Sequence, residues 1–312
     1  MQNQYSFHLF TRLGLMCLLG ILYSCKGSKA LNQADSASEA SVEPLPKALL
    51  WKITGQDLTA PSYLYGTIHV IGSNDYMMLP EVEEAFKASE QLALEIDMDD
   101  PGMLMAMMSG MNMKGDSSLA DVMAPEDYEK VHQFLLDSAG VPEMGMKQIE
   151  RMMPMLALSV IYPKMLNGGL KSYEQEFVGM AKAQEKEVLG VEKIEDQLSV
   201  FSQIPYRAQA EVLLEYANDF AEQKRVLNNM ISLYLDQDIE GLLNLMDESD
   251  GGNLGNFEEI LLERRNRNWI PVIGEMATEK PTFFAVGSGH LAGEAGVIKL
   301  LQEAGYTVEP VL

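Results

Sequence analysis

The 312-residue sequence predicts a mixed α/β (α+β) fold with a central, mostly parallel sheet and a large helical insertion. Short apolar runs of strand length lie near both ends of the chain, whereas the middle has helical periodicity. Near the start, a strand at residues 63–71, a helix that opens at Pro80 and a strand at 92–96 form one strand–helix–strand unit. Such units join parallel strands, so we expect parallel pairing at the centre of the sheet.

The other predicted elements alternate between short apolar runs and amphipathic stretches. In chain order they are a strand at 49–54, helical structure over 101–162, a helix at 172–186, a strand at 187–191, helices over 204–246 and 257–278, a strand at 283–286, a helix at 294–304 and a strand at 307–311. We therefore expect residues 48–312 to form one domain.

The first residues are typical of a targeting segment. Arg12 precedes an apolar run at 13–22 that is too short to span a bilayer but suits a signal peptide. The sequence LYSC that ends at Cys25 resembles a bacterial lipobox, in which the cysteine is lipidated. This predicts a lipoprotein signal peptide at 1–24, a disordered tether at 25–47, and export to the bacterial cell envelope with the lipid anchored on its periplasmic or surface face. The alternative is an ordinary secretory signal with an incidental cysteine.

Composition excludes several classes of function. The formal net charge of −23 argues against nucleic-acid binding, which needs a basic face. Removal of the signal peptide would leave Cys25 as the single cysteine, so neither an internal disulfide nor a cysteine nucleophile is expected. The sequence contains no GxSxG, HExxH or GxxxxGK[ST] motif, which argues against the enzyme classes that those motifs mark.

Two matching Gly-x-x-His elements stand at opposite ends of the predicted domain. A predicted strand leads to Gly66 and His69 near the start, and another leads to Gly287 and His290 near the end. Glycine has no Cβ, so a ligand or another backbone can approach closely there. The repeated pattern predicts one site that both ends of the fold complete.

Acidic residues at strand ends complete the candidate site. Glu95 interrupts an apolar strand, where a carboxylate needs a partner or a metal ion, and Glu192 ends a later strand in the same way. Imidazole and carboxylate groups are the ligands of Zn²⁺ and similar ions. We therefore expect His69, His290 and Glu95 to bind a divalent cation, with Mn²⁺, Co²⁺ and Zn²⁺ all open.

A basic cluster at residues 264–269 stands out in this acidic chain. On a helix, Arg265, Asn268 and Trp269 share a face, which predicts that Arg265 binds a substrate carboxylate or stabilises an oxyanion. A surface ion-pair network is the alternative. A methionine run at 103–113 favours a helix core or an adaptable binding surface over a Cu(I) site.

Five segments together resemble the TraB/GumN family, and the resemblance extends from residue 49 to the C-terminus. They are LWKITG…YLYGTIHV, LALEID, LGVEKIEDQ, RNRNW and AVGSGHLAGEAGVIKLLQEAGYTV. The family includes the Tiki-type proteins, membrane-tethered metal-dependent peptidases with paired GxxH motifs and an essential glutamate. The resemblance therefore implies a peptidase activity and a fold like that of the erythromycin esterases and the ChaN haem-binding lipoproteins.

The resemblance also assigns roles to individual residues. His69 and His290 match the two GxxH histidines, and Glu95 matches the acid after the first helix. Arg265 and Asn266 match an RNxxW element. Glu174 falls where many members have an aspartate. We expect His69, Glu95, His290 and Arg265 to be catalytic, and the surrounding set to support them or to contact substrate: Gly66, Glu174, Glu192, Asn266 and Gly287.

Three functions remain in competition on the sequence alone. The leading one is a lipid-anchored, metal-dependent hydrolase, with a peptide or small molecule as its substrate. The second is a metal-free, esterase-like hydrolase in which His69 acts as general base and Glu95 tunes its pKa. The third is a non-catalytic lipoprotein that binds haem, a metal or a peptide.

Overall fold

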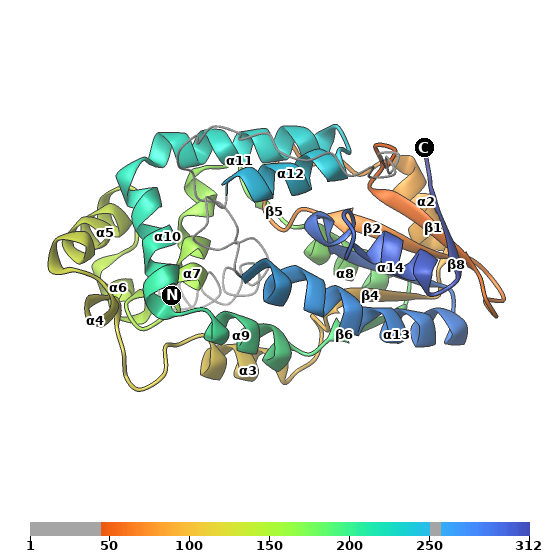
Figure 1. The fold of residues 1–312 in the computed structure, drawn as a ribbon, viewed down its shortest axis with the longest axis horizontal. Coiled ribbons are helices and arrows are strands. Elements are labelled where there is room, and N and C mark those ends of the chain that lie inside the picture. The colour runs from red at the N-terminus through yellow and green to blue at the C-terminus, as the bar shows by residue number, and fades with distance from the viewer. Residues whose placement is uncertain (1–44, 250–256) are drawn as a thin grey trace, which may run out of the picture.

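The computed structural model describes residues 45–249 and 257–312 of the chain (Figure 1). The predicted signal peptide, the lipidation residue Cys25 and the tether as far as residue 44 lie outside these ranges. Within the described ranges, none of the helices combines the length and the apolar character that a membrane span requires.

A six-stranded sheet forms the centre of the molecule, in the order β6-β4-β7-β2-β1-β8. The strands are β1 (Leu50–Gly55), β2 (Ser62–Thr67), β4 (Gln91–Ile96), β6 (Glu187–Glu192), β7 (Thr282–Gly287) and β8 (Tyr306–Pro310). The strands β6, β4, β7 and β2 pair in parallel, whereas β1 is antiparallel to both of its neighbours. The mixed α/β fold with a mostly parallel sheet is therefore confirmed.

The two strands that carry the Gly-x-x-His elements are adjacent. β7 lies between β2 and β4, and its register with β2 pairs Gly66 with Val286 and Thr67 with Gly287. The last long strand of the parallel sheet is thus inserted into the first strand–helix–strand unit. This register brings the carboxyl ends of β2 and β7 side by side.

Helices cover both faces of the sheet (Figure 1). One face is covered by α2 (Pro80–Ala88) and α8 (Tyr173–Ala183), the other by α13 (Arg264–Glu279) and α14 (Val297–Glu303). Aromatic rings fill the first interface, with Phe86 of α2 at 5.7 Å from Phe177 of α8 and 5.3 Å from Phe283 of β7. Burying such large rings is a major source of stability for the layered core.

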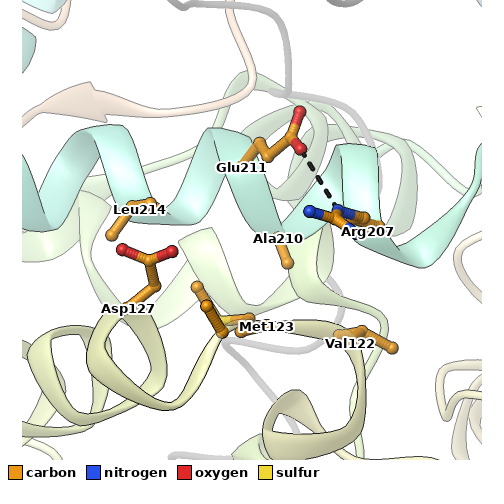
Figure 2. Close-up of a pocket in the computed structure, with 8 residues that line it drawn as sticks. Val122, Met123, Asp127, Arg207, Ala210, Glu211 and Leu214 are labelled. Atoms are coloured by element: carbon orange, nitrogen blue, oxygen red, sulfur yellow. Dashed lines mark ion pairs between the residues drawn. The ribbon is translucent and has the colours of Figure 1, made fainter.

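The helical insertion extends to the side of the sheet (Figure 1). Its α-helices are α3 (Met103–Gly110), α4 (Leu119–Val122), α5 (Pro125–Asp137), α6 (Glu143–Ile149), α7 (Pro154–Ala157), α9 (Ile194–Gln203), α10 (Tyr206–Asn218), α11 (Phe220–Leu235) and α12 (Ile239–Ser249). Figure 2 shows a small pocket here, between residues 122–124, α5 and α10, where Arg207 lies 3.6 Å from Glu211. None of the predicted site residues lines this pocket.

Two of the differences between the predicted elements and the structure have a clear physical cause. The strand predicted at 63–71 ends at Thr67, because the chain bends at His69 and Ile71–Gly72 (β3) pairs instead with Leu170–Lys171 (β5) in a second, two-stranded sheet. The helical stretch at 204–246 is three helices, interrupted at two polar turns. At the first, Asp219 accepts a hydrogen bond of 3.0 Å from the Glu222 amide and caps α11.

Contacts with the domain begin slightly before the predicted end of the tether. The Leu45 amide donates to Glu240 at 2.9 Å, and the Lys47 ammonium lies 3.0 Å from Asp238. Asp238 lies in the turn between α11 and α12, and Glu240 lies in the first turn of α12. The chain therefore enters the fold along this turn.

Candidate metal and active site

The candidate site lies at the carboxyl edge of the four parallel strands. His69 follows β2, Glu95 lies near the end of β4, Glu192 ends β6, and His290 closes a 3₁₀ turn that follows β7. Open α/β sheets bind ligands at this edge, because the loops after parallel strands converge there. The topology therefore brings side chains from both ends of the chain to one place.

Glu95 is the centre of the cluster. Its Oε1 lies 3.6 Å from His69 Nε2 and 3.9 Å from His290 Nε2, and it accepts a hydrogen bond of 2.8 Å from the Gly287 amide. Only 2% of Glu95 is exposed. Burial favours the neutral acid, but Arg265 and the two histidines outweigh it and lower the pKa of Glu95 to about 2. The carboxylate is therefore ionised at neutral pH.

His69 is held by a second carboxylate. Its Nδ1 donates to Glu174 Oε1 across 2.7 Å, and that carboxylate also accepts hydrogen bonds from Thr67 and Ser172 at 2.7 and 2.6 Å. This arrangement directs Nε2 of the ring towards Glu95. Burial opposes the charged imidazolium, but the charge of Glu174 outweighs burial and raises the pKa of His69.

His290 is held by a neutral amide instead. The Asn266 Nδ2 donates to the Ala295 carbonyl at 2.8 Å, which leaves Asn266 Oδ1 to accept from His290 Nδ1 at 2.6 Å. His290 Nε2 then accepts from Arg265 Nη1 at 3.2 Å, since a guanidinium can only donate. Burial and the neighbouring Arg265 charge lower the pKa of His290 to about 3, so this ring is neutral.

Arg265 is buried, with 9% of its surface exposed. Its Nη2 donates at 2.6 Å to both Glu95 Oε2 and Glu192 Oε1, and its Nη1 donates at 2.9 Å to the Leu261 carbonyl. Leu261 lies in a π-helical turn, Glu259–Glu263, directly before α13. Such turns free carbonyl groups and occur often at functional sites. Arg265 is therefore part of the site, and the surface ion-pair alternative does not describe it.

The predicted face of α13 requires one correction. Asn268 is exposed, whereas Asn266 is 2% exposed and holds His290. Trp269 lies on the buried face as predicted, where its Nε1 donates to Glu192 at 3.1 Å. The helix packs so closely against the site that two adjacent residues, Arg265 and Asn266, both contact the site histidine His290.

Gln197 of α9 is a site residue that the sequence analysis missed. Its Nε2 donates to Glu95 Oε2 and to Glu192 Oε1, both at 3.1 Å, and the residue is 1% exposed. Gln197 lies in the LGVEKIEDQ segment, on the apolar face of an amphipathic helix, and this position was the available sign that it is buried.

The second carboxylate that Gln197 contacts is less acidic than usual. Burial raises the pKa of Glu192, although Arg265 opposes this shift.

The donor set fits a divalent cation. Each histidine is hydrogen-bonded at Nδ1, the arrangement typical of metal-binding imidazoles, and each directs Nε2 towards the same oxygen of Glu95. The cluster also contains three carboxylates, Glu95, Glu174 and Glu192, but one permanently charged cation, Arg265. This excess of negative charge suits an additional cation.

The cluster as it stands is not closed around such an ion. In the part of the chain that the structure describes, no group of three or more His, Cys, Asp or Glu side chains is gathered closely enough to hold a metal. Gly287 keeps the space between the donors open, because a Cβ there would lie 2.7 Å from His69 Nε2 and 3.2 Å from Glu95 Oε1. A cation would need the donors to move inward and the Arg265 guanidinium to leave His290.

Other residues considered in the sequence lie away from the cluster. Asp99 and Asp100 are exposed, and both of their amides donate to Asp97 in a loop after β4. In the methionine run, Met103 and Met107 are buried while Met105 is 73% exposed. The aspartates therefore lie in a solvated loop, and the methionine run supplies the buried face of a helix.

The chain matches one protein family and several metalloproteases of animals. A family model described as the TraB/PrgY/gumN family matches residues 49–310. Metalloprotease TIKI1 of Danio rerio is 26% identical over 315 residues, covering 84% of this chain and 63% of the relative. TIKI1 of Homo sapiens is 24% identical, covering 95% and 68%, and a TIKI homolog of Nematostella vectensis is 22% identical, covering 81% and 65%. The chain thus spans about two thirds of the length of these relatives. No solved structure matches it significantly.

Proposed function

Since the chain belongs to the TraB/PrgY/gumN family, we propose that it is a metal-dependent hydrolase that cleaves peptide bonds. The observation that carries the proposal is the convergence of His69 Nε2 and His290 Nε2 on one oxygen of Glu95. The relatives named metalloprotease support the metal and the peptide substrate. An amide and a carboxylate fix the orientation of the two rings, as a metal site requires.

His69, His290 and Glu95 would hold the cation. A bound divalent cation supplies Lewis-acid polarisation of a carbonyl and a nucleophilic water at neutral pH. Glu174 fixes the tautomer of His69, and Asn266 fixes that of His290. Arg265 supplies a buried positive charge beside the cluster, where a guanidinium can orient a substrate or stabilise negative charge on its carbonyl oxygen.

Metal titration tests the proposal. We expect Mn²⁺, Co²⁺ or Zn²⁺ to bind the wild-type protein in calorimetry, and His69→Ala, His290→Ala and Glu95→Gln to lose most of that affinity. Asp99→Asn is the matched control, because its carboxylate is exposed and outside the cluster. Equal binding by all five proteins would contradict the metal site.

Turnover separates an enzyme from a binding protein. The cation-loaded protein is offered a library of quenched fluorescent peptides, and Glu95→Gln serves as the inactive control. Cleavage that depends on the cation and on Glu95 supports the peptidase. Cation binding without cleavage of any peptide or ester would favour the non-catalytic binding lipoprotein.

A second function is favoured by the surroundings of His69. The pair of His69 and Glu174, at 2.7 Å, is a carboxylate–imidazole arrangement that could activate water without a metal. In that case ester or peptide hydrolysis would persist in EDTA and would be lost in both His69→Ala and Glu174→Gln. The metal-dependent mechanism instead predicts that EDTA abolishes turnover and that added cation restores it.

We also propose that the protein is lipid-anchored through Cys25 in a bacterial cell envelope. The support is the apolar run followed by LYSC in the sequence. The several acyl chains of a bacterial lipoprotein hold a protein stably on a membrane, whereas a single chain does not. Cys25→Ser should therefore release the protein from the membrane fraction or block its processing. Unchanged fractionation and processing would contradict the anchor.

A further inference from the structure

We propose that Arg265 is a built-in competitor for the metal site, a cation that holds Glu95 and His290 until a divalent ion displaces it. The inference rests on the proposed function and concerns how tightly the site binds its cation. It assigns Arg265 a role in setting metal affinity, in addition to any contact with substrate.

The contacts of the guanidinium show the competition. Arg265 Nη1 lies 3.2 Å from His290 Nε2, and Nη2 lies 2.6 Å from Glu95 Oε2. A neutral imidazole whose Nδ1 carries the proton has one lone pair, on Nε2. While this lone pair accepts from Arg265, it is unable to bind a metal ion. His290 can therefore bind either Arg265 or a metal ion, but not both at once.

The structure also provides a place to which the guanidinium can withdraw. Arg265 Nε donates to the two oxygens of Glu192 at 3.1 and 3.2 Å, and Nη1 donates to the Leu261 carbonyl at 2.9 Å. The guanidinium carbon also lies 5.0 Å from the ring of Trp269, within the range of a cation–π contact. These contacts do not involve Glu95 or His290, so the charge remains paired after displacement.

Glu95 likewise keeps partners when Arg265 leaves. Its Oε2 still accepts from Gln197 at 3.1 Å, and its Oε1 accepts from the Gly287 amide at 2.8 Å. No buried polar group of the carboxylate is then left unsatisfied. Besides the inward movement of the donors, the exchange of one cation for another thus requires a shift of Arg265 from Glu95 towards Glu192, and both carboxylates already bind it.

Two substitutions should change metal affinity in opposite directions. Arg265→Gln removes the competitor and the like charge, so Zn²⁺ should bind about tenfold more tightly or better, since like charges a few ångströms apart repel even in well-screened surroundings. Glu192→Gln removes the charge that receives the displaced guanidinium. Arg265 then depends more on Glu95, and Zn²⁺ should bind about tenfold more weakly, as is typical when a group that supports a metal site is removed.

The matched control is Arg267→Gln. Arg267 is on the same helix but is exposed and pairs with Glu263, so its removal changes the net charge equally without touching the site. Zn²⁺ titration of EDTA-treated full-length proteins by calorimetry gives the four dissociation constants. We expect the order Arg265→Gln tightest, wild type equal to Arg267→Gln, and Glu192→Gln weakest.

Tryptophan emission gives a second readout of changes around Arg265. The chain has two tryptophans, so the change Trp51→Phe leaves Trp269, which contacts both Arg265 and Glu192, as the only reporter. Zn²⁺ should alter its emission with the same dissociation constant as in calorimetry. Trp269 also lies 4.4 Å from the His290 ring, so a metal ion on His290 affects its emission directly. The emission change on Zn²⁺ binding should therefore be smaller in the Arg265→Gln background, where no guanidinium is displaced. Glu192→Gln decides the matter if Arg265→Gln does not fold.

Each outcome separates this inference from the proposed function. If the wild type binds Zn²⁺ but Arg265→Gln binds it equally or more weakly, Arg265 supports the site instead of competing for it, and the inference fails alone. Tighter binding by Glu192→Gln, or a Zn²⁺-induced change of Trp269 emission that is equally large with and without Arg265, overturns it as well. If no protein binds any divalent cation, the proposed metal-dependent function fails and the inference fails with it.

Discussion

The two Gly-x-x-His elements share a local design but have opposite electrostatic surroundings. Each follows a parallel strand, and each directs a histidine Nε2 towards Glu95 Oε1. His69 donates to the Glu174 carboxylate, which raises its pKa against the effect of burial. His290 donates to the amide of Asn266 and faces Arg265, and burial together with that charge lowers its pKa to about 3.

The difference shows that the motif and its partners control separate properties. The motif places an imidazole at a strand end. Its charge is set by residues elsewhere in the chain, since Glu174 lies 105 positions after His69 and Asn266 lies 24 positions before His290. Two copies of one motif can therefore give, in the same cluster, one histidine with a raised pKa and one that is neutral at neutral pH.

The largest effect should come from the residue that both histidines share. Glu95→Gln removes the ionised oxygen that faces both rings, so we expect cation affinity and turnover to fall about 100-fold or more, as loss of a few kcal/mol implies. The free energy of unfolding should fall by about 1–3 kcal/mol, because buried donors lose a charged acceptor. Calorimetry and urea denaturation measure the two effects. If Glu95→Gln bound the cation as tightly as the control Asp99→Asn, Glu95 would not be the residue through which the two histidines act.

Exchanging the partners of the two histidines should exchange their charges. Glu174→Gln gives His69 an amide, and its pKa should fall below that of the wild type. Asn266→Asp gives His290 a carboxylate, and its pKa should rise. Each change should weaken cation binding by about 10–100-fold, the usual effect of altering a group that holds a metal-binding imidazole. NMR of the ring protons follows each pKa, and unchanged values would mean that burial alone sets them.

The two motif glycines provide a smaller and more local comparison. In Gly287→Ala the new Cβ would lie 2.7 Å from His69 Nε2 and would push that ring away from Glu95. In Gly66→Ala it would lie 3.0–3.2 Å from Leu291 and Ser288, away from the imidazole. Both should lose about 1–3 kcal/mol of stability to overpacking. Only Gly287→Ala should also reduce cation affinity, and an equal loss in Gly66→Ala would contradict the direct contact.

The smallest effect concerns the pH dependence of stability in cation-free protein. His290 has a lowered pKa when folded, so the free energy of unfolding should fall as pH drops below about 6.5, where the unfolded ring takes up a proton. His69 has a raised pKa, so its stabilising contribution is present below about 6.5 and is lost as pH rises through the folded value. Urea denaturation at several pH values should show that His290→Asn flattens the acid side and His69→Asn the neutral side. If His69→Asn flattened the acid side and His290→Asn the neutral side, the directions of the two pKa shifts would be reversed.

Patterns that repeat along the sequence predicted the fold and the centre of the site. Short apolar runs indicated the strands, and the duplicated Gly-x-x-His indicated that two distant strand ends meet. Glu95 was predicted to be buried with partners because a carboxylate in an apolar strand requires them, and it is buried. These features are local, so a sequence is sufficient to reveal them.

Features that depend on how elements dock were predicted less well. Helical periodicity gave Asn268 the same face as Arg265, but the close approach of α13 after a π-helical turn buries Asn266 instead. Gln197 falls on the apolar face of α9, but its role is evident only from the packing of α9 against Glu95 and Glu192. Only tertiary packing determines which polar residues of a helix are turned inward.

The position of β7 has a consequence for how the protein is made. This strand completes the middle of the parallel sheet, and its first amide donates to Ser62, a residue 220 positions earlier. Contacts between such distant positions form late and slow folding, because a long loop must close first. A growing chain therefore leaves β2 and β4 without the strand that separates them until synthesis is almost complete. The candidate site is therefore incomplete during most of the synthesis, and its strand ends come together only after β7 has been made.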